Sequence, residues 1–216
     1  MFEILLPDDV VVASMVDNAG AAPLLPEEEA YVARAVEKRR QEFTAGRHCA
    51  REALRRLGAP VGPIPVTATR APVWPESVAG SITHCTGLTA AAVGWASRYA
   101  GIGIDAEPAE PLSAGLERLI CTPAERERLS RMDTPEIHRV RLVFCAKETV
   151  HKAIAPMSGV TLGFHDVEID FTAAGEFAVR LVGARDERLP PLDRIRGRHA
   201  LTDELILAAA TLLRSS

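Results

Sequence analysis

The sequence has few aromatic residues, no basic surplus and no long apolar run. Aromatic residues make up 5% of the 216-residue chain, too few for a surface on which nucleic-acid bases stack. The formal net charge is −4, whereas non-specific nucleic-acid binding needs an excess of lysine and arginine. The longest largely apolar run, Leu205–Leu213, has nine residues, and a membrane-spanning helix needs about 20. We therefore expect neither a nucleic-acid partner nor a membrane span.

Several sequence motifs are missing as well. The four cysteines form no C-x-x-C pair and lack zinc-finger spacing, so we interpret them as small buried residues in a reducing compartment. The chain has no P-loop, G-x-G-x-x-G or G-x-S-x-G motif, which argues against P-loop, Rossmann and serine-hydrolase sites. Its first ten residues include three acidic and no basic side chains. They are therefore unlike a leader peptide, and we expect a cytoplasmic protein.

Lysine is also scarce, and its placement is uneven. Only three of the 25 basic residues are lysine, which leaves 22 arginines. Lys147 and Lys152 lie within six residues of each other, with Glu148 between them. Lysine carries a compact ammonium that differs from a guanidinium in hydration and pKa range. The pair therefore indicates a site that needs an ammonium, with chance clustering as the alternative.

Apolar periodicity and the placement of proline and glycine predict a chain of mixed helices and strands. A helix is expected over residues 25–57, with a break near 44–46 and a stop at Gly58. Five prolines exclude regular helix from the loop at 58–79. Pro156 is expected to end the helix at 137–155. The other predicted elements are a helix at 123–132 and strands at 80–84, 90–96, 102–107, 167–171, 176–182, 198–201 and 205–212.

A weak internal repeat suggests two similar halves. The segments GSITHCTGLTAAAVGW (80–95) and GRHALTDELILAAATL (197–212) both read as hairpins and share a glycine, a leucine and two alanines in register. No linker or low-complexity segment separates the two parts of the chain. We therefore predict an α+β fold with an N-terminal α/β subdomain at 1–105 and a C-terminal one at 106–216, joined in one compact unit.

Two carboxylates follow each other on one predicted strand. Asp105 and Glu107 point to the same side of the strand at 102–107, about 7 Å apart, because side chains alternate between its faces. Both carboxylates can reach one hard cation such as Mg²⁺, which prefers oxygen ligands. The alternative is a strand that ends in an acidic, solvated turn at Pro108.

Glu148 and Lys152 are spaced four residues apart on a predicted helix, on the face opposite its apolar stripe. They form either a surface ion pair of modest strength or an acid and an ammonium that face a cleft. In a cleft, Glu148 can serve as a third metal ligand or general base, and Lys152 can hold a phosphate. The turn at 80–87, with Thr83 and His84, offers hydrogen-bond donors to an anion, although a lone histidine is more often structural.

Taken together, these stretches resemble the 4′-phosphopantetheinyl transferases of the surfactin/enterobactin type, the larger monomeric class. The pattern G-[IV]-D-x-E matches residues 103–107, and [FW]-x-x-K-E-x-x-x-K matches residues 144–152, with a gap of 148 − 107 = 41 residues. Residues 39–51, 70–75 and 80–84 also resemble family blocks. The resemblance is closest to actinobacterial members that serve siderophore, polyketide, nonribosomal peptide and lipid pathways. It implies a monomer of two similar α/β subdomains with pseudo-twofold symmetry and the active site between them.

The resemblance also implies an activity and a set of site residues. Such enzymes transfer 4′-phosphopantetheine from coenzyme A to a serine of an apo acyl or peptidyl carrier protein and release 3′,5′-ADP. Glu148 is the family's candidate for activating the serine, and Mn²⁺ fits the same oxygen ligands as Mg²⁺. The implied roles are metal ligands at Asp105, Glu107 and Glu148; pyrophosphate contacts at Lys152 and Lys147; coenzyme A phosphate contacts at Thr83 and His84; and 3′-phosphate or adenine contacts at Arg39, Arg47 and Arg70.

Two other functions stay open at this point. A Mg²⁺-dependent hydrolase of a nucleotide pyrophosphate would use the same three acids but direct water at phosphorus. A non-catalytic module that binds coenzyme A would not need Glu148. For the transferase, residues 119–132 offer a mixed apolar and basic surface that includes Arg126, Arg128 and Arg131, and we predict that the acidic carrier protein docks there. His151 occupies a position that is usually small or apolar in the family, and the sequence does not explain it.

Overall fold

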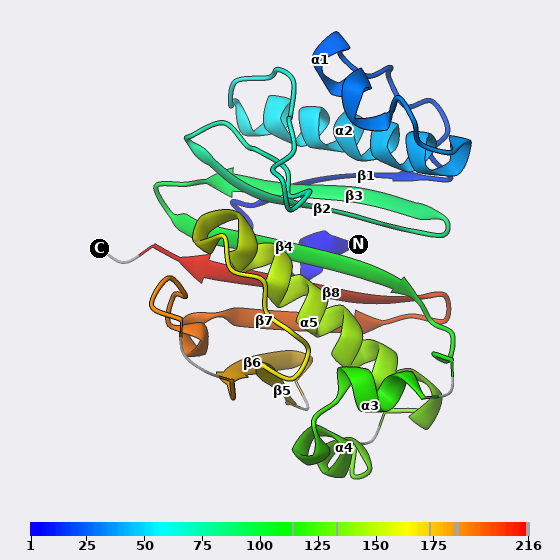
Figure 1. Cartoon of the computed structure of the whole chain (residues 1–216), viewed down its shortest axis with the longest axis vertical. Helices are drawn as coiled ribbons and strands as arrows, with labels where there is room; N and C mark the ends of the chain where they lie inside the picture. The colour runs from blue at the N-terminus through cyan, green and yellow to red at the C-terminus, as the bar shows by residue number, and fades with distance from the viewer. Residues whose placement is uncertain (114, 133, 173, 184–185, 215–216) are drawn as a thin grey trace.

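The computed structural model describes residues 1–113, 115–132, 134–172, 174–183 and 186–214. Its strands form two antiparallel sheets, and in the view of Figure 1 the three-stranded sheet lies above the five-stranded one. The three-stranded sheet has the order β1 (Val11–Val16), β3 (Leu88–Trp95), β2 (Val78–Cys85). The five-stranded sheet has the order β4 (Tyr99–Pro108), β8 (Leu205–Leu213), β7 (Arg196–Leu201), β6 (Glu176–Leu181), β5 (Val167–Phe171). The α+β class predicted from the sequence is confirmed.

Two long helices each cover one of the sheets. α2 (Glu37–Leu57) packs on β1 and β3, and α5 (Glu136–Ser158) crosses β4 and β8, as Figure 1 shows. The short helices are α1 (Pro26–Glu29), α3 (Leu116–Ile120) and α4 (Pro123–Leu129), with 3₁₀ turns at Phe2–Ile4, Ala30–Val32 and Leu192–Arg194. Within the described parts of the chain, no helix is long and apolar enough to cross a bilayer.

The two sheets are built in the same chain order. The repeat at 80–95 and 197–212 falls on the hairpins β2–β3 and β7–β8. In each half, a strand and a long helix precede the hairpin, and the last strand pairs with both others: β3 with β1 and β2, β8 with β4 and β7. The division after residue 105 falls inside β4, and the pseudo-twofold axis stays a prediction.

β2 and β4 lie side by side where the two sheets meet. Side-chain hydroxyls on β2 accept hydrogen bonds from the backbone of β4: the amide of Ile104 donates to Ser81 Oγ (3.1 Å) and that of Ala106 to Thr83 Oγ1 (3.3 Å). Buried backbone amides need such partners, so the hydroxyls join the sheets. They also place the end of β2 beside Asp105 on β4.

α5 lies unusually close to β4 because the strand carries two glycines at the crossing. A Cβ at Gly101 would lie 2.1 Å from the carbonyl oxygen of Ala153, and one at Gly103 would lie 2.0 Å from that of Thr149. Glycine is the residue that lets two backbones approach this closely. The contact brings Asp105, two residues beyond Gly103, within reach of side chains on α5.

Some expectations from the sequence need correction. β1 was not predicted, although its valines and the Asp and Asn residues that flank it are typical of a strand. The strand pairs with β3. The helical region breaks at 33–36 rather than at 44–46. At 44–46 the helix is continuous: the Thr44 hydroxyl donates to the carbonyl of Arg40, and Gly46 packs against Ile82.

Pro156 lies inside α5 instead of ending it. The helix continues for two more residues and ends at Gly159, which has the left-handed φ of 64° typical of a C-cap. Pro156 removes one hydrogen bond, that from its own position to the carbonyl of Lys152, and only two helical residues follow it. The loop predicted at 58–79 is confirmed up to residue 77, since β2 begins at Val78.

The glycine contact leads to a stability prediction. We expect Gly103→Ala to lower the free energy of unfolding by about 3 kcal/mol, because the new methyl group overpacks the contact with α5. Urea unfolding measures this difference. Gly62→Ala is the matched control, since a Cβ there meets nothing within 4 Å, and its effect should stay within about 0.5 kcal/mol. Equal stability of the two variants would contradict the close packing of α5 on β4.

Candidate active site

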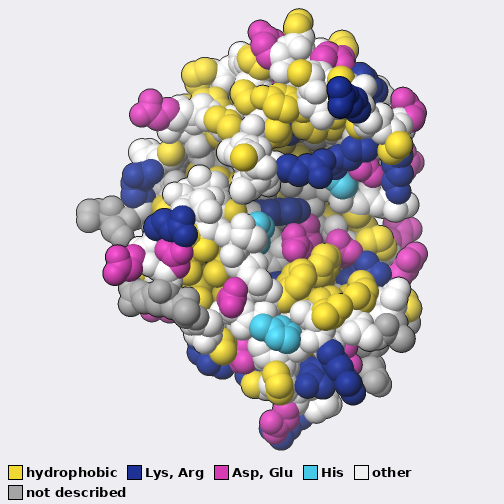
Figure 2. Space-filling view, in the orientation of Figure 1, with side chains coloured by type: hydrophobic (Ala, Val, Ile, Leu, Met, Phe, Trp, Pro, Cys, Tyr) yellow, Lys and Arg dark blue, Asp and Glu magenta, His cyan; other side chains and the backbone are white. Residues whose placement is uncertain are grey.

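A cavity of about 380 Å³ opens between α2 on one side and β4 and α5 on the other. In Figure 2 a row of lysine and arginine side chains crosses this face of the molecule, with carboxylates just below it. All the residues predicted for the site line the cavity except Lys147. They are Arg39, Arg47, Arg70, Thr83, His84, Asp105, Glu107, Glu148 and Lys152.

Asp105 forms the buried centre of this cavity. Its Oδ1 accepts hydrogen bonds from Lys152 Nζ (2.6 Å) and from Thr83 Oγ1 (3.0 Å). Lys152 Nζ also lies 3.2 Å from Thr83 Oγ1. Burial disfavours the charge of Lys152, but the charge and hydrogen bond of Asp105 outweigh it and raise the pKa of the ammonium. The three side chains therefore lock β2, β4 and α5 together at one point.

The other two carboxylates stand around this centre. Glu107 Oε2 accepts a hydrogen bond from Arg141 Nη1 at 2.7 Å. Glu148 reaches the cavity from α5. Burial raises the pKa of both carboxyl groups above the ordinary value, and the negative charge of Asp105 adds to the effect.

These carboxylates suit a hard divalent cation. Asp105 Oδ2 is buried and has no hydrogen-bond partner of ordinary length within the described residues, a costly state for a carboxylate oxygen. The buried Cys145 thiol lies near this carboxylate, and burial together with the charge of Asp105 raises the pKa of the thiol. A cation bound to Oδ2 would relieve that cost and the mutual repulsion of the acids. Across the described ranges, no group of three or more histidine, cysteine, aspartate or glutamate side chains is placed so that it could hold a metal ion as it stands. Asp105 and Glu107 instead have one oxygen each bound to a cationic side chain, while Mg²⁺ and Mn²⁺ accept such oxygen ligands.

His84 and Arg39 form one wall of the cavity. Arg39 Nη1 lies 3.0 Å from His84 Nε2, and Glu42 approaches both, at 3.6 Å from Arg39 and 3.9 Å from His84. Burial lowers the pKa of His84, although the charge of Glu42 opposes the shift. At neutral pH the imidazole is therefore mostly uncharged, and the guanidinium of Arg39 supplies the positive charge of this wall.

Arg47 is held in place by an aromatic ring and by the backbone of the loop. Its guanidinium lies 4.2 Å from the centre of the Phe43 ring, and Nε donates to the carbonyl of Ile64 at 2.8 Å. The buried carboxylate of Glu28 accepts the amide of Ile64 at 2.9 Å and Arg51 Nη1 at 2.6 Å. Burial lowers the pKa of Arg47 to about 10, so it still carries its charge at neutral pH.

Arg70 enters the cavity from the loop that joins α2 to β2. The loop is pinched by a bridge between Val66 and Pro72, and Arg70 has a positive φ of 67°. That conformation is rare for a side chain of this size, and such strain persists only where the surroundings enforce it. Arg39, Arg47 and Arg70 thus come from two separate segments of the chain to one cavity.

Lys147 does not belong to this group, which corrects the expectation that it contacts a pyrophosphate. Its ammonium is buried and donates to Ile120 O (2.8 Å), Glu125 Oε2 (2.7 Å) and Phe164 O. The sequence carried a signal for this. Residues five apart differ by about 140° around a helix, so Lys147 and Lys152 cannot share a face. Lys147 instead lies on the apolar stripe, four residues after Val143.

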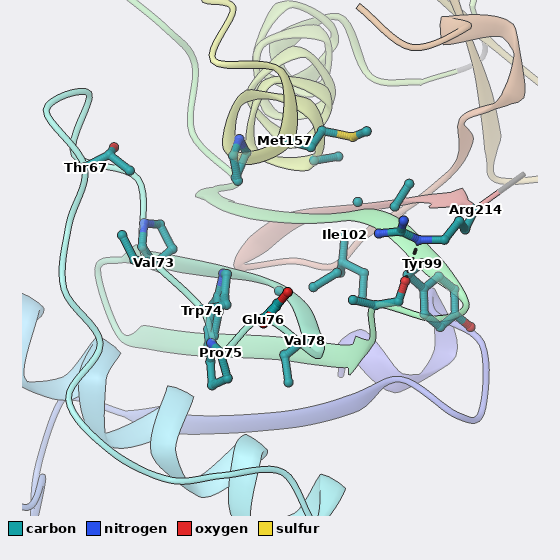
Figure 3. Close-up of a pocket in the computed structure, with 18 residues that line it drawn as sticks. Thr67, Val73, Trp74, Pro75, Glu76, Val78, Tyr99, Ile102, Met157 and Arg214 are labelled. Atoms are coloured by element: carbon teal, nitrogen blue, oxygen red, sulfur yellow. Dashed lines mark hydrogen bonds between the residues drawn. The ribbon is translucent and has the colours of Figure 1, made fainter.

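Two further cavities continue from the site along β2 and α5. The first, of about 300 Å³, shares Glu148 and Lys152 with the main cavity and is also lined by His151, whose Nδ1 is buried. The second, of about 270 Å³, lies beyond it between Trp74, Met157 and Arg214 (Figure 3). It contains none of the residues predicted for the site.

Sequence reasoning missed several residues that line or support the main cavity. Glu42 and Phe43 on α2 and Tyr31 in the 3₁₀ turn before it line the cavity. Single polar or aromatic residues of this kind carry no functional signal of their own. Arg141 was also missed. It lies seven residues before Glu148, a spacing that puts both on one helix face, and this spacing could have identified it.

Comparison with known proteins identifies the family. The model described as the 4′-phosphopantetheinyl transferase superfamily matches residues 101–208, and that of the 4′-phosphopantetheinyl transferase N-terminal domain matches residues 27–94. The chain belongs to the 4′-phosphopantetheinyl transferase superfamily. Its enzyme class is that of the phosphopantetheinyl transferases, as the motifs at 103–107 and 144–152 predicted.

Relatives of actinobacterial origin match almost the whole phosphopantetheinyl transferase chain. The 4′-phosphopantetheinyl transferase Svp of Streptomyces mobaraensis is 42% identical over 97% of this chain and 88% of its own length. PptT of Mycobacterium tuberculosis is 39% identical over 95% of this chain and 93% of its own. A holo-(acyl-carrier-protein) synthase from Bacillus anthracis, solved in complex with CoA (3′,5′-ADP), aligns with 55% of this chain and 99% of its own at 21% identity and a TM-score of 0.42. The family membership rests on the sequence matches.

The buried ion pair of Lys147 leads to a second stability prediction. We expect Lys147→Met to lower the free energy of unfolding by about 3 kcal/mol, because it leaves the Glu125 carboxylate buried without its ammonium. Chemical denaturation measures the loss. Lys38→Met, at an exposed position of α2, is the control and should change stability by less than about 0.5 kcal/mol. If Lys147→Met were as stable as this control, the ammonium would not hold α4 against α5.

Proposed function

We propose that this phosphopantetheinyl transferase is Mg²⁺-dependent, uses coenzyme A as donor and modifies a serine of an apo carrier protein. The observation that carries the proposal is one cavity in which the carboxylates of the two motifs meet Lys152 and three arginines. Coenzyme A carries a diphosphate and a 3′-phosphate, and these anions match the positive side chains. Planar guanidinium groups bind phosphate through two parallel hydrogen bonds.

The two sides of the cavity suit two parts of the donor. Arg39, Arg47 and Arg70 would hold the 3′-phosphate and the nucleotide, since their side chains come from α2 and the loop after it. Thr83, His84 and Lys152 would bind the diphosphate beside the carboxylates. The adjoining cavity of about 300 Å³ would receive the pantetheine arm. Glu148 and Lys152 line both cavities, as does Arg70, so the diphosphate would lie where the two cavities meet.

The serine oxygen attacks the phosphorus next to the pantetheine, and the bond from that phosphorus to the bridging oxygen of the diphosphate breaks. Phosphopantetheine stays on the serine, and 3′,5′-ADP leaves with the bridging oxygen. A serine hydroxyl is a weak nucleophile and needs a base within hydrogen-bond reach. Glu148 is the candidate, because it faces the cavity beside Lys152. A divalent cation on Asp105, Glu107 and Glu148 would neutralise charge on the diphosphate. Lys152 adds a positive charge at the same place, held there by Asp105.

The carrier protein is proposed to dock beside α3 and α4. Leu119 is 65% exposed there. Phe144 lines the cavity and packs in the same apolar cluster as Ile120. Arg128, predicted from the sequence to meet the carrier, also donates to the buried Glu168 at 3.0 Å, and its Nε lies 2.7 Å from Asp170 Oδ1. Exposed apolar groups, rather than Arg128, are therefore proposed to carry the docking energy.

The mass of an apo carrier protein tests the proposed activity. After incubation with this enzyme, coenzyme A and Mg²⁺, we expect a gain of one phosphopantetheine that EDTA abolishes. Glu148→Gln should lower the turnover number at least about 100-fold, as loss of a general base does. Glu204→Gln, at an exposed position, is the control and should be as active as the wild type. Release of free phosphopantetheine without carrier would instead identify a hydrolase, and coenzyme A binding without reaction would identify a binding module.

Docking has its own test. We expect Leu119→Glu to raise the Michaelis constant for the carrier about tenfold, because a charge replaces an apolar contact at an interface that an acidic partner covers. The Michaelis constant for coenzyme A should stay unchanged. Val16→Glu is the matched control, since Val16 is also 65% exposed but lies on β1. An unchanged carrier constant in Leu119→Glu would remove α3 from the docking surface.

A further inference from the structure

Arg141 shares one face of α5 with the functional residues of the cavity. It precedes Glu148 by 148 − 141 = 7 residues and Lys152 by 152 − 141 = 11 residues. Two and three helical turns take about 7 and 11 residues, so the three side chains are stacked along the helix. Arg141 and Lys152 therefore flank Glu148 on the side that faces β4.

The guanidinium of Arg141 is fixed by three partners. Nη1 donates to Glu107 Oε2 at 2.7 Å, Nε to the carbonyl of Glu110 at 2.6 Å and Nη2 to that of Pro111 at 3.3 Å. The Arg141 side chain is 12% exposed and that of Glu107 is 20% exposed. Because the planar fork is anchored on the backbone after β4, Arg141 holds Glu107 in one orientation.

The same arrangement occurs on the neighbouring carboxylate. Lys152 binds Asp105 Oδ1 and leaves Oδ2 buried without a hydrogen-bond partner of ordinary length among the described residues. In the same way, Arg141 binds Glu107 through Oε2. Oε1 is the oxygen of this carboxylate that the guanidinium does not hold. Each carboxylate of β4 is thus held through one oxygen by a cation from α5. This leaves a second oxygen of each for another ligand.

We propose that Arg141 is a positioning residue for the metal site: by holding Oε2 of Glu107 it presents Oε1 to the divalent cation. The proposal rests on the proposed function, which supplies the cation. A free glutamate side chain must lose rotamer freedom when it binds a metal, and Arg141 removes that freedom beforehand. Partners that orient metal ligands in this way typically change metal affinity 10–100-fold when mutated.

A competing role for Arg141 predicts the opposite sign. If the guanidinium merely neutralised Glu107, its removal would leave a more negative cavity and would tighten cation binding. If it positions Glu107, its removal weakens cation binding although the cavity becomes more negative. The direction of the change in metal affinity therefore separates the two roles.

The experiment measures Mn²⁺ binding to the full chain in the presence of coenzyme A, by electron paramagnetic resonance of the free ion. We expect Arg141→Gln to weaken Mn²⁺ binding about tenfold. In the transfer assay the Mg²⁺ concentration at half-maximal rate should rise by a similar factor, with a smaller change at saturating Mg²⁺. Arg139→Gln is the matched control. Arg139 lies on the same helix and donates to the carbonyls of Thr134 and Met132, and its loss should leave Mn²⁺ binding unchanged.

Unchanged or tighter Mn²⁺ binding by folded Arg141→Gln overturns the proposal. Should that variant not fold, Arg141→Lys decides. It keeps the charge beside Glu107 but cannot reach both carbonyls, so it should bind Mn²⁺ more weakly than the wild type, and equal or tighter binding overturns the proposal. The wild type is assayed for phosphopantetheine transfer in the same series. Failure of that transfer refutes the proposed function, whereas transfer with unaltered Mn²⁺ affinity in the variants refutes only the role of Arg141.

Discussion

The geometry of the main cavity depends on the close crossing of α5 over β4. Gly101 and Gly103 let the helix backbone approach the strand, and only at that separation can Lys152 reach Asp105 at 2.6 Å. The ion pair in turn binds Thr83 and so connects β2, which belongs to the other sheet. One contact between two backbones therefore aligns both sheets with the helix that carries Glu148 and Lys152.

Buried charge is used in two different ways in this molecule. Glu28, Glu125 and Glu168 are almost fully buried, and each is paired with lysine or arginine and bonded to groups from distant segments. Such pairs add little net stability, but removing one partner is costly. Asp105 differs from these residues because one of its oxygens is left without a hydrogen-bond partner of ordinary length in the described structure. This unsatisfied oxygen distinguishes the candidate metal site from the structural ion pairs.

Two of the three lysines of the chain lie on α5, at positions where the structure needs a compact ammonium. Lys147 fills an enclosed site in which two carbonyls and a carboxylate converge on one atom, a geometry that a compact ammonium matches and a planar guanidinium does not. Lys152 stands at the cavity, where the ammonium bridges Asp105 and Thr83. Both positions require a point charge, although only one of them faces the cavity.

The sequence by itself determined the features that depend on short-range geometry. A spacing of two along a strand put Asp105 with Glu107, and a spacing of four along a helix put Glu148 with Lys152. The motifs identified the family and all the charged residues that line the cavity except Glu42. The tertiary structure decided what each charge pairs with, because an ion pair between distant residues depends on which elements pack together. Lys147 pairs with Glu125, Glu107 with Arg141 and Arg128 with Glu168 for that reason. The pairing of β1 with β3 was likewise decided by the tertiary structure, because the valine-rich run at 11–16 favours a strand but does not say which strand it joins.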